Sequence, residues 1–406
     1  MTRSAPLAAP ATSTPRHRLV GASRRPLVGT FAVLALVASA GLGYLGWRGY
    51  QITKRIVGGT TVEQVTDPTS PGYMASVTPT PVHLLAVLDD EGRPRDFTVL
   101  VEGTGDEGGG DVLWVVGDLA IDTDAGKVPL EETYRSQGAD AVRSMLEVIF
   151  GWGISDVTEV GPAEIASLVE PVGAVEIENP DPVRDEATGT TFAAGELTLE
   201  ADEVADFLLA RARGEAATNR GTRAELVWEA LFEALGSSED AAVAAGAEVL
   251  TDRGADLRAV TRNMARGAVG FRLLPVRDEP FGPTRLYVPD PERTPAALEV
   301  LVQAPVSAYP GQRPRTEIYN GTTDTDAARS LASAVSGAGA EVVAIGNATT
   351  LDREVTTVEF HDPAWAEAAA RIAELFDVEA TASADQTDGK DVTVVLGPGA
   401  TTGAGT

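Results

Sequence analysis

Residues 316–348 read TEIYNGTTDTDAARSLASAVSGAGAEVVAIGNA, and this stretch decides how the C-terminal part of the chain folds. Residues 316–319 are closed by the turn pair Asn-Gly at 320–321, apolar residues recur every four positions from 327 to 335, and a short apolar run covers 341–345. A segment closed by Asn-Gly and a short apolar run both indicate strands, and a four-residue repeat is typical of a helix. The stretch therefore predicts one strand–helix–strand unit.

A second unit of the same kind follows. The runs VTTVEF at 355–360 and VTVVL at 392–396 favour strands. Between them, Asp362 suits the N-cap of a helix and Pro363 suits its first helical position. Two such units predict a small α/β domain at 316–397.

Toward the N-terminus, residues 83–302 have the pattern of a larger domain. Its strand-like runs, separated by polar turns, are 84–88, 97–101 and 112–116. Helical spacing follows at 142–149, 165–169 and 204–208, and the capping-box pair Thr222 and Glu225 predicts the start of a further helix. Strands followed by helices in this order indicate a layered α/β/α architecture.

The segment 26–47 contains no charged residue and is long enough to cross a bilayer as a helix. Five arginines and no acid precede it in residues 1–25, so the N-terminus is expected in the cytoplasm and the rest of the chain outside the cell membrane. The alternative is a cleaved signal peptide, because Ala38, Ser39 and Ala40 resemble a cleavage site. Both interpretations export the larger part of the chain.

Charge and composition exclude several classes of function. The whole chain carries −28 while residues 1–25 carry +5, so the remaining residues carry −33, which argues against binding of nucleic acid. The chain has no cysteine and only three scattered histidines. A thiolate catalyst, a disulfide framework and a histidine-ligated zinc site are therefore not expected.

The small domain resembles the LytR C-terminal domain. The shared pattern is a strand ending in Asn-Gly at 320–321, a helix rich in Ala and Leu, a strand ending in Gly-Asn-Ala at 346–348, and a last strand ending in Leu-Gly at 396–397. Residues 83–302 resemble, with fewer matching motifs, the catalytic domain of LytR-CpsA-Psr proteins. The supporting segments include LLAVLDD at 84–90, DVLWVVGDLAID at 111–122 and NRGTRAEL at 219–226.

This resemblance implies a membrane-anchored protein that acts outside the cell on glycopolymers carried by a polyprenyl pyrophosphate, with peptidoglycan as acceptor. The family's paired arginines match Arg211 with Arg213 and Arg220 with Arg223, which we expect to bind the pyrophosphate. The first pair can face one phosphate only if the helix has ended before it, because residues two apart on a helix point about 200° apart. The family's magnesium-associated acids match Asp89 and Asp96, and carboxylate oxygens suit Mg²⁺.

Several motif positions depart from the family. Gly117 stands where the family has an arginine expected to contact phosphate, and the family's Lys-Ile-Asn stretch reads Pro129-Leu130-Glu131 here. Further departures are Ala217, Ala224 and Glu225. Loss of cations from a phosphate site removes stabilisation of the transition state, so these changes predict weak or absent catalysis. Arg135 is the candidate for a replacement cation.

Three functions follow from these observations. The preferred one is a membrane-anchored cell-envelope protein that binds a polyprenyl-linked or wall glycopolymer with weak or no catalysis. The first alternative is an active, Mg²⁺-dependent phosphotransferase that attaches glycopolymer to peptidoglycan. The second is an acidic scaffold for another envelope protein. Convergence of the four arginines on one pocket favours a ligand, whereas their scatter over the surface favours the scaffold.

The expected organisation has seven parts. They are a basic cytoplasmic arm (1–25), a transmembrane helix (26–47), a stalk (48–82), the LytR-CpsA-Psr-like domain (83–302), a linker (303–315), the LytR C-terminal domain (316–397) and a tail (398–406).

Overall fold

The computed structural model describes residues 65–103, 108–123, 126–237, 257–281, 284–383 and 389–400. The predicted basic arm and transmembrane helix lie outside these residues. Within the described ranges, no helix combines the length and the apolar character needed to span a bilayer.

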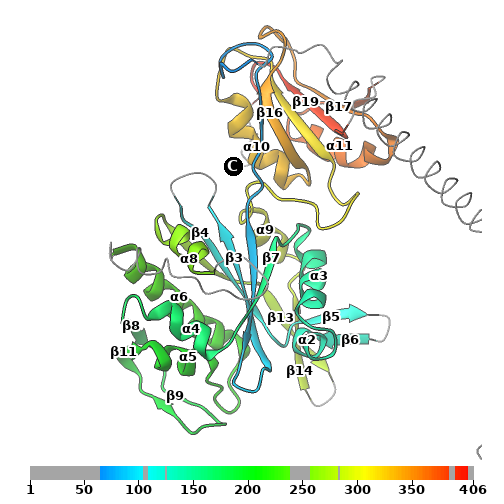
Figure 1. The fold of residues 1–406 in the computed structure, drawn as a ribbon. Coiled ribbons are helices and arrows are strands. Elements are labelled where there is room, and N and C mark those ends of the chain that lie inside the picture. The colour runs from blue at the N-terminus through cyan, green and yellow to red at the C-terminus, as the bar shows by residue number, and fades with distance from the viewer. Residues whose placement is uncertain are drawn as a thin grey trace, which may run out of the picture. The chain divides into compact units, whose positions relative to one another are not determined.

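The larger domain is built on a five-stranded sheet with the order β12-β4-β3-β2-β7 (Figure 1). Its strands are β2 (Val82–Leu88), β3 (Pro94–Glu102), β4 (Gly110–Val116), β7 (Asp156–Val160) and β12 (Val269–Leu273). The three central strands are antiparallel neighbours, and both edge strands run parallel to the strand beside them. The three strands expected from the apolar runs are the three central ones.

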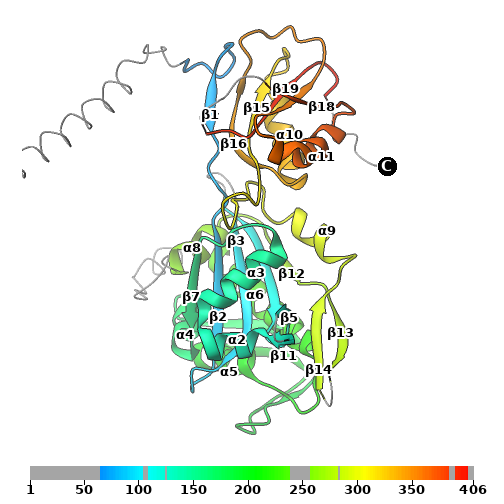
Figure 2. The same cartoon turned by 90° about the vertical axis from the view of Figure 1, so that its right-hand side faces the viewer.

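Helices cover both faces of this sheet (Figures 1 and 2). One face carries α2 (Leu130–Gln137) and α3 (Ala139–Phe150). The other carries α4 (Pro162–Val169), α5 (Ala201–Leu209), α6 (Ala217–Ser237) and α8 (Leu257–Ala265). This arrangement confirms the predicted α/β class for the larger domain.

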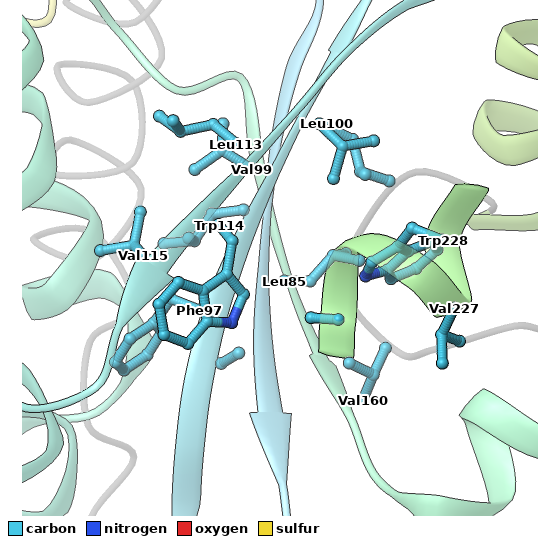
Figure 3. Close-up of a cluster of buried hydrophobic side chains, with 14 of the residues drawn as sticks. Leu85, Phe97, Val99, Leu100, Leu113, Trp114, Val115, Val160, Val227 and Trp228 are labelled. Carbon is cyan, nitrogen blue, oxygen red and sulfur yellow. The ribbon is translucent and has the colours of Figure 1, made fainter. Parts of the chain in front are cut away.

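The core forms because alternate residues of each strand enter opposite layers. Phe97 pairs across the sheet with Val115, and Val99 pairs with Leu113, so these four side chains share one face (Figure 3). Leu85 and Leu100 lie on the opposite side, toward Val227 and Trp228 of α6. All eight side chains are buried.

Smaller elements surround the central sheet. Within the described residues, four two-stranded antiparallel sheets pair β5 (Ala120–Thr123) with β6 (Gly126–Pro129), β8 (Ala174–Asn179) with β11 (Gly195–Glu200), β9 (Val183–Arg184) with β10 (Thr191–Phe192), and β13 (Val276–Phe281) with β14 (Thr284–Pro289). The short helix α9 (Thr294–Glu299) follows. Its position agrees with a proline at the second helical residue.

The C-terminal sheet has the order β1-β16-β15-β19-β17-β18. Its strands are β1 (Met74–Ser76), β15 (Arg315–Asn320), β16 (Glu341–Asn347), β17 (Thr357–Phe360), β18 (Ala380–Ala382) and β19 (Val392–Leu396). The helices α10 (Ala327–Gly337) and α11 (Ala366–Glu374) pack on it through alanine, leucine and isoleucine side chains. The Asp362 carboxylate accepts a 2.8 Å hydrogen bond from the Ala364 N–H, which confirms the predicted cap.

The end of the expected stalk belongs to this sheet. Met74–Ser76 form β1, which pairs antiparallel with β16. The buried Asn347 amide also donates 2.8 Å hydrogen bonds to the carbonyl oxygens of Pro68 and Ser70. The chain from Pro68 to Ser76 is therefore an ordered edge of the C-terminal domain, whereas its proline and threonine content had favoured an irregular stalk.

Candidate functional site

Three of the four predicted arginines gather around one buried carboxylate. Asp96 lies in β3 and is 6% exposed. The nearest guanidinium nitrogen of Arg220 is 3.5 Å from its carboxylate, and the charges of Arg211 and Arg223 also act on it. We call Arg211, Arg220 and Arg223 the arginine cluster.

Arg220 and Arg223 face the sheet because α6 begins earlier than predicted. The capping-box interpretation of Thr222 is wrong: this residue lies inside α6, and its hydroxyl donates back to the Thr218 carbonyl oxygen. A Cβ at Gly221 would lie 2.6 Å from the Trp114 ring, so only glycine lets α6 approach the sheet this closely. Arg223 therefore lies beyond the first turn of α6, away from the N–H groups at the helix N-terminus that attract an anion.

Arg211 lies in extended chain directly after α5, as the resemblance required. Its backbone N–H donates to Asp185 over 2.9 Å, and its carbonyl oxygen accepts from the Glu186 N–H. The side chain then reaches α2, where one guanidinium nitrogen is 2.6 Å from both a carboxylate oxygen of Glu131 and the carbonyl oxygen of Arg95. Arg211 is thus fixed at its backbone and at its charged end.

Two of the departures from the family lie side by side here. A Cβ at Gly117 would lie 2.6 Å from a carboxylate oxygen of Glu131 and 2.7 Å from the Arg95 carbonyl oxygen. The Glu131 N–H also donates to the Gly117 carbonyl oxygen over 3.1 Å. Gly117 therefore leaves the space that the Glu131 carboxylate uses to reach Arg211.

Arg223 is held inside the domain. It forms an ion pair with Glu215, donates to the Ala210 carbonyl oxygen over 2.5 Å, and lies 5.9 Å from the centre of the Phe207 ring. Arg223 is 3% exposed, and burial lowers its pKa from the ordinary value. Glu215 thus neutralises a guanidinium that water hardly reaches.

Arg220 is the least satisfied member of the arginine cluster. It is 7% exposed, yet its two carboxylate contacts are long, at 3.5 Å to Asp96 and 3.8 Å to Asp118. Its Nε–H has no hydrogen-bond partner among the described residues, which is equally true of the Nε–H groups of Arg211 and Arg223. Arg220 differs from these two because neither of its carboxylate contacts is short. A guanidinium carries five N–H donors, so this buried group keeps unused donor capacity.

The carboxylates leave no excess of positive charge around the arginine cluster. Asp96, Asp118, Glu131 and Glu215 face its three guanidinium groups. Burial raises the pKa of Asp96 above its ordinary value despite Arg220 and Arg211, and burial likewise raises the pKa of Glu131 despite Arg211. Both carboxyls therefore take up a proton more readily than an exposed acid.

The other predicted cations lie outside the cluster. Arg213 lines a neighbouring pocket of about 340 Å³ with Asn219 and Arg223, and forms no hydrogen bond or ion pair with the described residues. The half-exposed Arg135 pairs with Glu132 at 3.1 Å and lies 4.0 Å from Glu131. Arg135 is therefore engaged by these two acids and does not replace the arginine that the family has at the position of Gly117.

The predicted magnesium ligands carry arginine contacts of their own. The Asp89 carboxylate accepts from the side chains of Arg93 and Arg95 at 2.8 and 2.9 Å, and from the backbone N–H groups of Glu91 and Arg93. No group of three or more His, Cys, Asp or Glu side chains placed to hold a metal occurs in the part of the chain that the structure describes. Because arginine side chains already contact Asp89 and Asp96, these two carboxylates do not fit as a pair of free metal ligands. Binding of Mg²⁺ stays a prediction of the resemblance.

The C-terminal domain matches a known family. Residues 313–399 match the family model described as LytR cell envelope-related transcriptional attenuator. The chain carries a LytR C-terminal domain. The match agrees with the resemblance found over 316–397. No curated protein matches the chain.

Solved structures resemble part of the chain at low sequence identity. TagV of B. subtilis is 16% identical over 55% of this chain and 96% of its own, with a TM-score of 0.46. A LytR-Csp2A-Psr enzyme from Actinomyces oris is 19% identical over 55% and 90%, with a TM-score of 0.42. B. subtilis TagT with bound octaprenyl pyrophosphate lipid is 13% identical over 60% and 93%, with a TM-score of 0.42.

Proposed function

We propose that this protein is an extracytoplasmic, membrane-anchored cell-envelope protein of LytR-CpsA-Psr type that binds a polyprenyl-linked or wall glycopolymer with weak or no catalysis. The observation that carries the proposal is Arg220, a buried guanidinium whose two carboxylate contacts are both long, at 3.5 and 3.8 Å. Burial of a charged donor without full hydrogen bonding is costly. A phosphate oxygen of a ligand would supply the missing acceptor.

The same geometry supports weak catalysis. Phosphoryl transfer needs fixed positive charge where negative charge develops in the transition state. Here Glu131 holds Arg211, Glu215 holds Arg223, and Gly117 leaves the family's arginine position without a cation. A bound phosphate would gain hydrogen bonds at Arg220 but little net positive charge.

Attachment to the cell membrane rests on the sequence of residues 26–47 and on the five arginines before it. Peptidoglycan or a polyprenyl-carried glycopolymer would then lie on the same side as both domains. The mass of the protein recovered from membranes tests this part, since loss of the first 40 residues would mean a cleaved signal peptide.

The two alternatives differ in what the arginines should do. An acidic scaffold predicts arginines scattered over the surface, whereas three of the four surround Asp96 and two of them are nearly inaccessible to water. An active phosphotransferase predicts a free cation near Gly117, whereas Arg135 pairs with Glu132 and the Arg211 guanidinium beside Gly117 pairs with Glu131. Binding without efficient turnover therefore accounts for more of the site.

Incubation of the full chain with farnesyl pyrophosphate, with and without Mg²⁺, tests the proposal. We expect saturable binding that the Arg220→Met variant lacks, and no cleavage of the pyrophosphate. Release of phosphate at a rate that depends on Arg220 would favour the phosphotransferase. Absence of binding by the wild-type chain would favour the scaffold.

A further inference from the structure

We infer that Glu131 is a specificity-determining residue, which makes the site take a ligand with a single phosphate in preference to a pyrophosphate. The inference rests on the proposed function. Its basis is a carboxylate of the protein that pairs with one arginine of the cluster at 2.6 Å, next to a second arginine whose carboxylate contacts are longer, at 3.5 and 3.8 Å.

The Glu131 carboxylate lies where a ligand phosphate would meet Arg211. Its oxygen is 2.6 Å from the Arg211 guanidinium, a short charge-assisted hydrogen bond. Its side chain is 13% exposed, and the backbone contact to Gly117 fixes its direction. The charged groups that face it are Arg211, Arg135, Asp96 and Asp118.

A phosphate that reached the same nitrogen of Arg211 would have to displace this carboxylate, and one that reached the unpartnered Arg211 Nε–H would lie close to it. The displaced Glu131 would keep its charge close to the incoming phosphate, and Asp96 and Asp118 would add to the repulsion. Gly117 offers no side chain that could compensate. A second phosphate is therefore disfavoured at Arg211 as long as Glu131 is ionised.

Arg220 is buried but less strongly paired than Arg211. Its carboxylate contacts at 3.5 and 3.8 Å are too long for strong hydrogen bonds, and its Nε–H has no partner in the described chain. Arg213 lies in the adjoining pocket without a hydrogen bond to the described residues. Arg220 can donate to one phosphate that enters beside it, such as a polyprenyl monophosphate or a phosphodiester of a glycopolymer.

Calorimetric titration of the full chain with farnesyl monophosphate and farnesyl pyrophosphate tests this inference. We expect the wild-type chain to bind the monophosphate at least as tightly as the pyrophosphate. Glu131→Gln should tighten pyrophosphate binding about tenfold or more, the effect of one hydrogen bond to a charged group, and change monophosphate binding less than about threefold. Glu131→Ala should act in the same direction.

Glu132→Gln is the matched control, since it removes the same charge from the next residue, which is half-exposed and pairs with Arg135. It should leave both affinities unchanged. An unchanged ratio of affinities in both Glu131 variants, or an equal change in the control, would overturn the inference. Failure of both probes to bind any of these chains would instead remove the proposed function on which the inference rests.

Discussion

Replacement of Arg220 by methionine should destabilise the protein in a way that depends on pH. The variant leaves the Asp96 carboxylate buried without its nearest cation. A buried carboxylate without a partner escapes this cost by taking up a proton. The cost of protonation therefore sets the upper limit of the loss in free energy of unfolding.

The limit can be estimated from the ordinary pKa of Asp96, which is 3.8. Each pH unit above the pKa adds about 1.4 kcal/mol, so protonation costs about 4 kcal/mol at pH 7 and about 2 kcal/mol at pH 5.5. Because burial already raises the pKa of Asp96 and loss of Arg220 raises it further, the variant regains stability as the pH falls. This pH dependence of stability is opposite to that of a carboxylate stabilised by an ion pair, whose contribution to stability is lost as the pH falls.

Urea unfolding followed by tryptophan fluorescence checks this prediction, since Trp114 and Trp228 lie in the core of the larger domain. The double variant Asp96→Asn/Arg220→Met carries neither buried charge, so we expect it to be within about 1 kcal/mol of the wild type at both pH values. An equal loss at pH 7 and pH 5.5, or a double variant as unstable as the single one, would refute the reasoning.

Three further predictions address packing, the ordered edge and the site. Gly221→Ala should lower the free energy of unfolding by about 1–3 kcal/mol, because its Cβ would overlap the Trp114 ring, and an unchanged urea midpoint would contradict this. Asn347→Ala should speed limited proteolysis within residues 65–77, because it removes two hydrogen bonds to that segment; mass spectrometry showing equal cleavage would argue against the anchor. Pyrophosphate affinity, measured by calorimetry, should rise as the pH falls from about 7.5 to about 5.5, because burial raises the pKa of Glu131 and protonation of Glu131 frees Arg211. The rise should largely vanish in the Glu131→Gln variant. An equal rise in the wild type and the variant would contradict this prediction.

Elements with a strong local pattern could be predicted from the sequence. Both strand–helix–strand units of the C-terminal domain are present, and Asp362 caps its helix as expected. The strand β1 could not be predicted, because Met74–Ser76 carry no pattern and become a strand only by pairing with β16. The predicted start of α6 at Thr222 was wrong. The capping-box pattern also fits the interior of a helix, and close packing of Gly221 against Trp114 keeps this part of α6 on the sheet.

The arginines of the site were easier to predict than their partners. Arg220 and Arg223 belong to one short motif, and three positions along a helix keep them on one face. Glu131 was noticed only as a departure, because its contact with Arg211 joins residues 80 positions apart. Glu215 was missed, since one more acid in an acidic chain gives no signal that it will be buried.

Calorimetric titration of farnesyl monophosphate into the wild-type chain and into the Asp96→Asn/Arg220→Met variant tests the central claim most directly. The variant should remain folded, and its loss of the Asp96 charge would by itself favour a phosphate, so a loss of binding would reflect the missing guanidinium. We predict saturable binding to the wild type and at least a tenfold loss in the variant, in line with about 1.5 kcal/mol or more for a hydrogen bond to a charged group. Equal affinity in the two chains would contradict the assignment of Arg220 as the phosphate-binding residue.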